Sequence, residues 1–264
     1  METVGVVGVG AMGSVFVERF IAAGVKTLVY DVSPVAIDRA IGLGGEACPS
    51  AQALARESDI VHVMVRNDAQ MLECVLGSGG ILDGLSAGKV LVLDSTVHPS
   101  TTRKIAEAAR PRGIGLADAC IGGIPAVLRA GDSSVIVGGD PDLVERIRPH
   151  LSRIGTVYHV GPVGSGNVTK IVKNLILGAH RLIISEGLQI AVAAGVEPLR
   201  VLEVLQHESP TWDRPENTFD YGPGLTFNKN LTEQILPPVE RLADELAVVV
   251  PITRLLIGMG KEQA

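Results

Sequence analysis

The sequence predicts an α/β protein in which a doubly wound sheet comes first, a long helix follows, and a smaller all-helical domain ends the chain. Three observations support this fold class. The first half alternates short valine-rich runs with helical patterns, as parallel β–α units do. A glycine-rich turn then opens an apolar helical pattern from 165 to 194. No strand pattern follows Val160 except the ambiguous run Val248–Val250.

The composition sets limits on the class of protein. The 264 residues leave room for two domains, and 46% hydrophobic with only 3% aromatic residues predicts a core filled by aliphatic side chains. The net charge of −6 argues against a nucleic-acid surface. Cys48, Cys74 and Cys120 show no disulfide pattern and no metal-ligand spacing, so we expect reduced thiols, no metal site and a cytoplasmic location. No secretion signal or membrane-spanning segment is expected.

The first β–α–β unit carries a dinucleotide-binding pattern. A strand at Thr3–Val7 leads into a glycine-rich turn and a helix to Ala23, and the next strand, Lys26–Tyr30, ends at Asp31. This context predicts a Rossmann-type domain in which a pyrophosphate meets the helix N-terminus. The alternative is a glycine-rich turn without a ligand. Asp31 would accept hydrogen bonds from ribose hydroxyls and repel a 2′-phosphate, which favours NAD over NADP. The residues of the turn predicted to bind the cofactor are Gly8, Gly10, Ala11, Met12 and Gly13.

The following strands end in two further candidate loops. After helices at 34–41 and 50–57, strands are expected at 60–65 and 89–94, with a helix at 69–76 between them. Ligands of doubly wound sheets bind at the carboxyl ends of strands, so Met64–Val65 and Ser95–Thr96 should face the cofactor. The alternative for Ser95–Thr96 is a cap on the helix expected at 100–110.

The first domain is expected to finish with one loop and two strands. Asp118–Pro125 is rich in small residues and is expected to form a loop whose backbone N–H groups could hold a carboxylate. Strands follow at 134–139 and 157–160, with a helix between them to Leu151. Glycine and proline then cluster, which predicts a nucleotide-binding domain over 1–162 and a helical substrate and dimerisation domain over 163–264.

The long helix from 165 to 194 is apolar on nearly every side. Such a helix is expected to be buried on every side, by its own chain or by another subunit. Lys170 and Asn174 nevertheless lie on one face of it, four residues apart. Lys170 needs a reason there, because an unpaired buried charge is costly. The alternative is a lysine whose stem is buried while its ammonium group stays in water.

Five motifs in order resemble those of the β-hydroxyacid dehydrogenases, the family of 3-hydroxyisobutyrate dehydrogenase, tartronate semialdehyde reductase and the glyoxylate/succinic semialdehyde reductases. The resemblance covers nearly the whole chain. Its motifs are Gly8–Gly13, Asp94–Pro99, Asp118–Gly123, Gly164–Asn174 and Phe227–Leu231.

The resemblance implies an NAD-dependent oxidoreductase that interconverts a small 3-hydroxyacid and its semialdehyde. It makes Lys170 the catalytic acid and base. The apolar long helix favours a homodimer or homotetramer, and the cysteines, charge and composition favour a cytoplasmic protein with no membrane or nucleic-acid partner. Substrate contacts are implied for Ser95, Gly122, Gly123 and Asn174, and cofactor contacts for Met64, Val65, Thr96 and Lys229.

Four positions depart from the family pattern. Gly122 stands where the family has a serine, so one hydroxyl contact is missing, and Ile124 replaces a glycine. Asn230 replaces an aspartate. Lys173 replaces an asparagine; it could repel the charge on Lys170 or bind a substrate carboxylate.

Three other functions stay open at this point. An imine reductase shares this architecture, although Lys170 counts against it because those enzymes usually carry another residue there. A 6-phosphogluconate dehydrogenase would need a longer chain and clustered basic residues. A dinucleotide-binding protein without catalysis would account for the altered motifs.

Overall fold

The computed structural model describes residues 2–208 and 236–262. The chain divides into two compact units, Met1–Asn174 and Leu175–Ala264, and each is described by itself. Lys229 and the rest of 209–235 lie outside the described residues.

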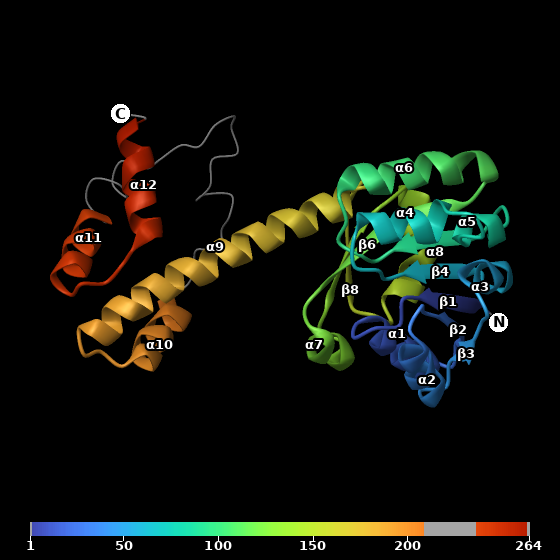
Figure 1. Cartoon of the computed structure of the whole chain (residues 1–264), viewed down its shortest axis with the longest axis horizontal. Helices are drawn as coiled ribbons and strands as arrows, with labels where there is room; N and C mark the ends of the chain where they lie inside the picture. Colours follow the sequence, from blue (N-terminus) through green and yellow to red (C-terminus); the bar gives the residue numbers. More distant parts are fainter. Residues whose placement is uncertain (1, 209–235, 263–264) are drawn as a thin grey trace. The chain divides into compact units, whose positions relative to one another are not determined.

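The first unit is built on one sheet of eight strands in the order β3-β2-β1-β4-β5-β6-β7-β8 (Figure 1). Neighbouring strands are parallel except β6 and β7, which are antiparallel. This topology is the predicted Rossmann-type sheet. The strands are β1 (Thr3–Val7), β2 (Lys26–Tyr30), β3 (Glu46–Ala47), β4 (Ile60–Val63), β5 (Val90–Leu93), β6 (Gly115–Gly122), β7 (Ser134–Gly138) and β8 (Thr156–Gly161).

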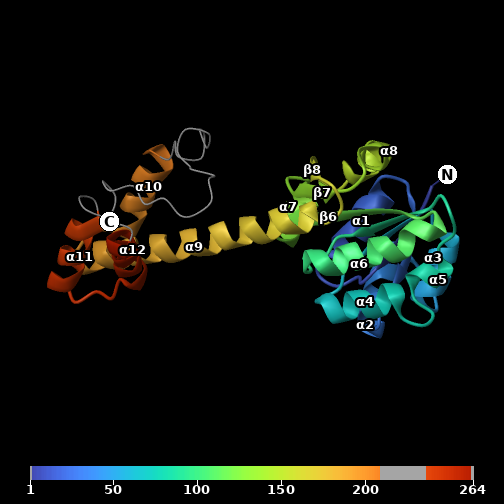
Figure 2. The same ribbon diagram turned by 90° about the horizontal axis from the view of Figure 1, so that it is seen from above.

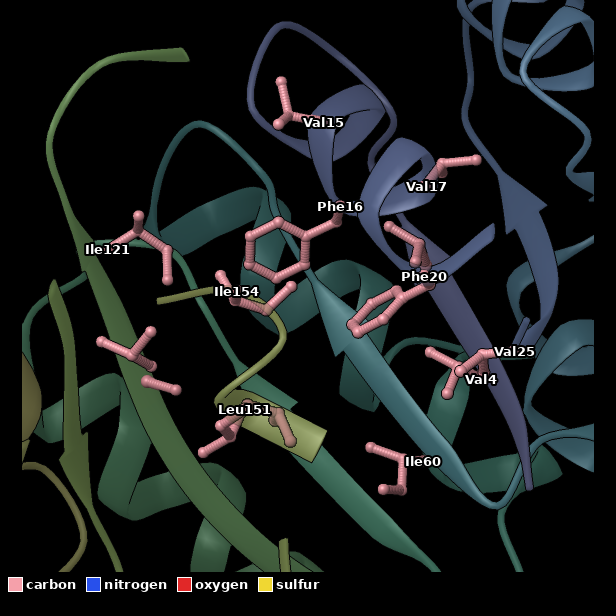
Figure 3. Packing of buried hydrophobic residues seen from close by; sticks show 14 of the residues in the cluster. Val4, Val15, Phe16, Val17, Phe20, Val25, Ile60, Ile121, Leu151 and Ile154 are labelled. Carbon is pink, nitrogen blue, oxygen red and sulfur yellow. The ribbon is translucent and has the colours of Figure 1, made fainter. Parts of the chain in front are cut away.

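Helices cover both faces of this sheet and bury two separate cores (Figure 2). One core holds Phe16 and Phe20 of α1, packed edge to face with ring centroids 5.8 Å apart, together with Leu128 of α7 and Ile147 and Leu151 of α8 (Figure 3). The other core lies under α3 to α6. The helices are α1 (Gly13–Ala22), α2 (Pro34–Gly42), α3 (Ala51–Glu57), α4 (Asp68–Leu76), α5 (Ile81–Gly84), α6 (Pro99–Ala109), α7 (Pro125–Ala130) and α8 (Pro141–Leu151), and a 3₁₀ turn follows α6 at Arg110–Arg112.

One expectation about loops is wrong, and the alternative given for a second loop is excluded. Asp118–Gly122 forms the second half of β6 rather than a loop, because β7 pairs with every residue of that stretch. Its small residues therefore fit a strand, and their backbone groups are not free to form a nest for a carboxylate. Ser95 and Thr96 do not cap α6, because the side chain of His98 accepts from the Ser100 N–H at its start.

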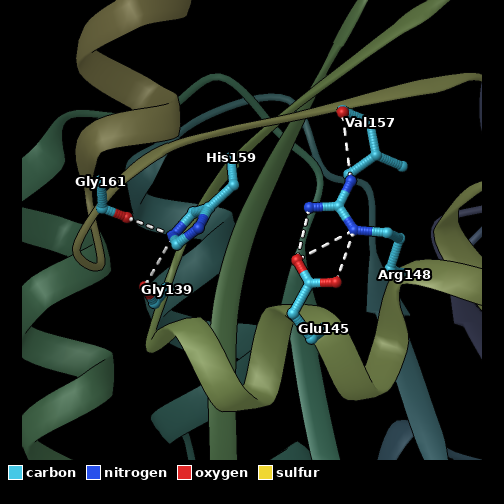
Figure 4. A network of polar contacts seen from close by, with 6 residues as sticks. All are labelled: Gly139, Glu145, Arg148, Val157, His159 and Gly161. Carbon is cyan, nitrogen blue, oxygen red and sulfur yellow. Dashed lines mark hydrogen bonds and ion pairs between the residues drawn. The ribbon is translucent and has the colours of Figure 1, made fainter.

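Polar contacts fix the end of the sheet from which the long helix begins (Figure 4). Arg148 of α8 pairs with Glu145 and also donates to the Val157 carbonyl of β8, at 3.3 Å. His159 Nε2 lies 3.1 Å from both the Gly139 and the Gly161 carbonyl oxygens. Since carbonyls only accept, Nε2 carries the proton, and the bond holds β8 where the chain turns toward the long helix.

The described part of the second unit is helical, as the sequence predicts. The long helix α9 (Ser165–Ala193) begins in the first unit, and its later turns pack with α11 and α12 around Ile190, Ala243 and Val250. Glu186 is buried on α9, where its carboxylate accepts from the N–H groups of Ile252 and Thr253 at the start of α12. The remaining helices are α10 (Pro198–Glu208), α11 (Leu236–Glu245) and α12 (Pro251–Glu262).

The chain itself does not bury α9 on every side, so the expected burial would require another subunit. Leu175 is 71% exposed and Leu182 61% exposed. The expectation that no segment has the length and composition of a membrane span is wrong, since Ser165–Ala193 passes that test. One such helix is weak support for a membrane protein, because core helices of soluble proteins pass the same test.

Candidate active site

A cleft of about 1360 Å³ lies at the carboxyl ends of β1, β2, β4 and β5 in the first unit. Most of the residues predicted from the sequence line it: Gly8, Gly10, Ala11, Met12, Gly13, Asp31, Met64, Val65, Ser95, Thr96, Gly123 and Lys170. Gly122, Lys173 and Asn174 are not among the described residues of its lining, although Lys173 and Asn174 follow Lys170 on α9. Lys229 is outside the described residues.

The glycine-rich turn at one end of the cleft fits a pyrophosphate. Gly8 has φ +89°, and a β-carbon there would lie 2.0 Å from the Met64 carbonyl oxygen. A β-carbon on Gly10 would meet nothing within 4 Å, so the open space over Gly10 is available to a ligand. No side chain caps α1, and the Ser14 N–H donates to the Gly10 carbonyl, so the N–H groups of Ala11, Met12 and Gly13 are the ones that can bind an anion. These residues would hold the phosphates of a dinucleotide.

Asp31 fixes the position of this turn as well as lining the cleft. Its carboxylate accepts from the Val9 N–H at 2.8 Å and from the Ser33 N–H at 2.9 Å. Each oxygen keeps a further lone pair that could accept from a ribose hydroxyl. Arg39 of α2 also lines the cleft, which places a cation at the same end as Asp31.

Ser95 joins two loops at the middle of the cleft. Its hydroxyl accepts from the Val65 N–H and donates to the Val65 carbonyl, both at 2.8 Å. The donor of Ser95 is thus already used, and its side chain is buried. Thr96 beside it is exposed, so the Ser95 bond holds Thr96 where it can face a cofactor.

Two buried histidines and Asp94, the residue before Ser95, form a chain of hydrogen bonds. His62 Nδ1 is 2.9 Å from Asp94 Oδ2, and His62 Nε2 is 2.8 Å from His150 Nε2. Arg153 donates to His150 Nδ1 at 3.3 Å, so His150 carries its proton on Nε2 and donates it to His62, which in turn donates to Asp94. Burial, then His62 and Arg153, lower the pKa of His150 to about 2. Burial raises the pKa of Asp94 despite its bond to His62.

Asp118 and Asn167 attach the start of α9 to the sheet. The buried Asp118 carboxylate accepts from the Gly164 N–H at 2.6 Å and from the Asn167 N–H at 2.7 Å. Asn167 has no exposed surface; its side chain accepts from the Val97 N–H at 2.8 Å and donates to the Thr102 hydroxyl at 3.0 Å. Asn167 therefore connects the Ser95–Thr96 loop to the helix that carries Lys170. The sequence did not identify Asn167 as a functional residue. Its position between Gly164 and Lys170, two residues of the motif at the start of the helix, was the available indication.

Lys170 also lines the cleft, and β6 holds its amine. Its Nζ donates to the Ile121 carbonyl of β6 at 2.6 Å. That carbonyl is free to accept because β5 pairs with β6 only as far as Asp118. Burial lowers the pKa of Lys170, and the charge of Lys173 lowers it further, whereas Cys120 opposes the shift. A half-buried amine with a lowered pKa is suited to proton transfer.

The amino-acid sequence matches two known domain families. The NAD-binding domain of 6-phosphogluconate dehydrogenase matches residues 3–164, and the NAD-binding domain of NADP-dependent 3-hydroxyisobutyrate dehydrogenase matches 164–211. The chain is 35% identical over 208 residues to 2-(hydroxymethyl)glutarate dehydrogenase of Eubacterium barkeri, covering 78% of this chain and 69% of that protein. The chain belongs to the β-hydroxyacid dehydrogenase family.

Two further relatives of this chain are named as dehydrogenases. It is 34% identical over 211 residues to 3-hydroxyisobutyrate dehydrogenase of Pseudomonas aeruginosa, covering 79% of this chain and 70% of that one. It is 30% identical over 210 residues to the NAD-dependent L-serine dehydrogenase of the same organism, with the same coverage. The resemblance seen in the sequence is thereby confirmed, and the first unit is an NAD-binding domain.

Solved structures share the fold. A 3-hydroxyisobutyrate dehydrogenase from Mycobacterium tuberculosis, determined with L-serine, aligns with a TM-score of 0.75 at 21% identity, covering 100% of this chain and 94% of that one. An imine reductase variant from Myxococcus stipitatus, determined with NAD⁺, aligns with a TM-score of 0.82 at 19% identity, covering 99% and 93%. At such identities the likeness concerns the fold alone.

Proposed function

We propose that this protein oxidises small acids of the form HOCH₂–CH(R)–COO⁻ to their semialdehydes with NAD⁺, and catalyses the reverse reduction. The substrates in the names of three relatives share this skeleton: R is a methyl group in 3-hydroxyisobutyrate, an ammonium group in L-serine and a carboxyethyl group in 2-(hydroxymethyl)glutarate. The observation that carries the proposal is Lys170, a half-buried amine in the cleft that the glycine-rich turn opens.

Lys170 is the group that moves the proton. A bound nicotinamide would supply the acceptor for the hydride of the carbinol carbon in the oxidation, and the hydride donor in the reduction. In the oxidation, the neutral amine of Lys170 takes the hydroxyl proton while the C–H bond breaks and the carbonyl forms. In the reduction, the ammonium group returns that proton to the carbonyl oxygen. The lowered pKa of Lys170 increases the fraction of neutral amine near neutral pH.

Other predicted residues have supporting roles in this proposal. The Ser95 bond to Val65 holds Thr96 beside the cleft, where it would contact the cofactor, and Asp31 would bind the adenine ribose and select NAD over NADP. Gly122, Gly123 and Asn174 lie around the carboxylate end of the substrate, and Lys173 adds a positive charge beside it. Lys229 remains a predicted cofactor contact, and a cytoplasmic location also remains a prediction.

The proposal includes a second copy of this chain as partner. Leu175 of α9 is more than two thirds exposed, and Leu182 nearly so, which is unusual for large apolar side chains along one helix. Packing of α9 against a second subunit would cover them. Light scattering on the purified protein distinguishes a dimer or tetramer from a monomer.

The test is turnover of NAD⁺ with 3-hydroxyisobutyrate, L-serine, 3-hydroxypropionate and 2-(hydroxymethyl)glutarate, followed by absorbance at the NADH band. At least one should be oxidised by the wild type. Lys170→Ala should lower kcat by a factor of about 10² to 10⁴ while NADH binding stays unchanged. Turnover of a cyclic imine but of none of the four acids would favour an imine reductase. NADH binding without any turnover would indicate a protein that binds dinucleotides but is not an enzyme.

A further inference from the structure

The space over Gly122 is filled by a hydroxyl from the neighbouring strand. Gly122 of β6 and Ser134 of β7 are direct partners in the antiparallel pair. A β-carbon built on Gly122 would lie 2.0 Å from Ser134 Oγ, and only 3.4 Å from Ser134 Cβ. The Ser134 hydroxyl therefore occupies the place that a side chain at position 122 would need.

This hydroxyl belongs to the face of the sheet on which α9 begins. Side chains alternate along a strand, so Asp118 and Gly122 share that face of β6. Asn167 of α9 contacts Asp118, and three residues later Lys170 contacts the carbonyl of Ile121, so helix and strand advance together. Ser134, the strand partner of Gly122, thus lies one residue along β6 from the carbonyl that holds Lys170.

The Ser134 hydroxyl has an unused donor, although Ser134, like Gly122, is not among the described residues that line the cleft. Its residue is partly exposed, and no described residue hydrogen bonds to its side chain. In a substrate of the form HOCH₂–CH(R)–COO⁻ the carboxylate is separated from the reacting carbon by one carbon atom. A group that binds this carboxylate must therefore lie close to the lysine but not at it.

We propose that Ser134 is the specificity-determining residue that donates a hydrogen bond to the substrate carboxylate, in the place left open by Gly122. This inference rests on the proposed function. The hydroxyl that the sequence lacks at position 122 is supplied from β7, twelve residues later in the chain. A glycine at 122 is required for this arrangement, because any side chain there would displace the Ser134 hydroxyl.

The experiment measures binding of 3-hydroxypropionate to the NADH-loaded full-length protein by calorimetry, and KM and kcat for its oxidation. Ser134→Ala removes the hydroxyl. Gly122→Ser combined with Ser134→Ala restores one from β6, and the geometry accommodates it because Ser134 Cβ lies at ordinary contact distance. Ser133→Ala is the matched control: its hydroxyl is buried and has no hydrogen-bond partner among the described residues.

We expect Ser134→Ala to weaken 3-hydroxypropionate binding and raise its KM by about tenfold or more, with kcat and NADH binding changed less than about threefold. The double variant should recover most of the affinity, and Ser133→Ala should match the wild type. Equal affinity in Ser134→Ala and wild type, or no binding by the wild type, overturns the inference. Binding by the wild type without turnover would overturn the proposed reaction alone, because the calorimetric comparison does not depend on catalysis.

Discussion

The part of the cleft around the glycine-rich turn and the part around Lys170 are built in different ways. At the glycine-rich end, the shape comes from backbone conformation within the first β–α–β unit, with Gly8 at positive φ and Asp31 bonded to Val9. At the Lys170 end, the shape comes from buried polar side chains that connect distant parts of the chain, such as Asn167 to Val97. The first end should therefore respond to changes in backbone freedom, and the second to changes in buried hydrogen bonding and pH.

The largest effect is expected from an added methyl group at Gly8. Gly8→Ala places a β-carbon 2.0 Å from the Met64 carbonyl at positive φ and should lower the free energy of unfolding by more than about 3 kcal/mol. Gly10→Ala is the control, because its β-carbon meets nothing in the protein. It should leave thermal unfolding unchanged but weaken NADH binding at least tenfold. Equal stability of the two variants would contradict the backbone account.

Removal of the Asn167 side chain tests the other end. Asn167→Ala leaves the buried Val97 N–H without its acceptor, which should cost about 1–3 kcal/mol of stability. Because the same side chain connects the Ser95–Thr96 loop to α9, kcat should fall by about 10². NADH affinity, measured by fluorescence, should change much less. A variant with normal kcat and lowered stability would show that Asn167 is structural only.

Acid should lower the free energy of unfolding through protonation of His150. The folded protein keeps His150 neutral, since its pKa is lowered to about 2, whereas the unfolded chain takes up a proton near pH 6.5. This contribution to stability is complete above pH 6.5 and is lost as pH falls, by up to about 1.4 kcal/mol per pH unit. Urea unfolding between pH 4 and 8 measures it. In His150→Phe the pH slope below 6.5 should be smaller, and an unchanged slope would assign it to other groups.

Asp31 should determine the choice of cofactor. Asp31→Ser removes the charge that would repel a 2′-phosphate, while Arg39 still lines the same end of the cleft. The ratio of kcat/KM for NADPH to that for NADH should rise by about tenfold or more. Arg39→Ala in the Asp31→Ser background should reverse the gain. A wild type that already prefers NADPH would refute the role assigned to Asp31.

The smallest effect is expected from Lys173. Its charge lowers the pKa of Lys170, so Lys173→Met should raise that pKa and move the alkaline rise of the oxidation rate to higher pH. The profile of kcat against pH from 6 to 10 measures this shift. Lys104→Met, on α6, is a control for the loss of one positive charge. A profile that does not move, together with a raised KM, would indicate that Lys173 binds substrate and does not tune Lys170.

The features that the amino-acid sequence predicts divide along the same line. The turn from Gly8 to Gly13, the strand before it and the helix after it were predictable, because all their contacts are local. The strand character of Asp118–Gly122 was not, since small residues suit a loop equally well until β7 pairs with them. Whether its own chain or another subunit covers Leu175 was also not predictable, because an apolar helix pattern does not show what covers it.

The sequence by itself determined the fold class, the dinucleotide-binding turn and Lys170 as the residue that needs a function. Periodicity, glycine positions and one charge in an apolar helix suffice for these. Only the tertiary structure brings Asn167 to Val97, His62 to Asp94 and Ser134 over Gly122. These pairs are 12 to 70 residues apart in the chain, and a hydroxyl absent from one strand can be supplied by its neighbour only after the two strands pair.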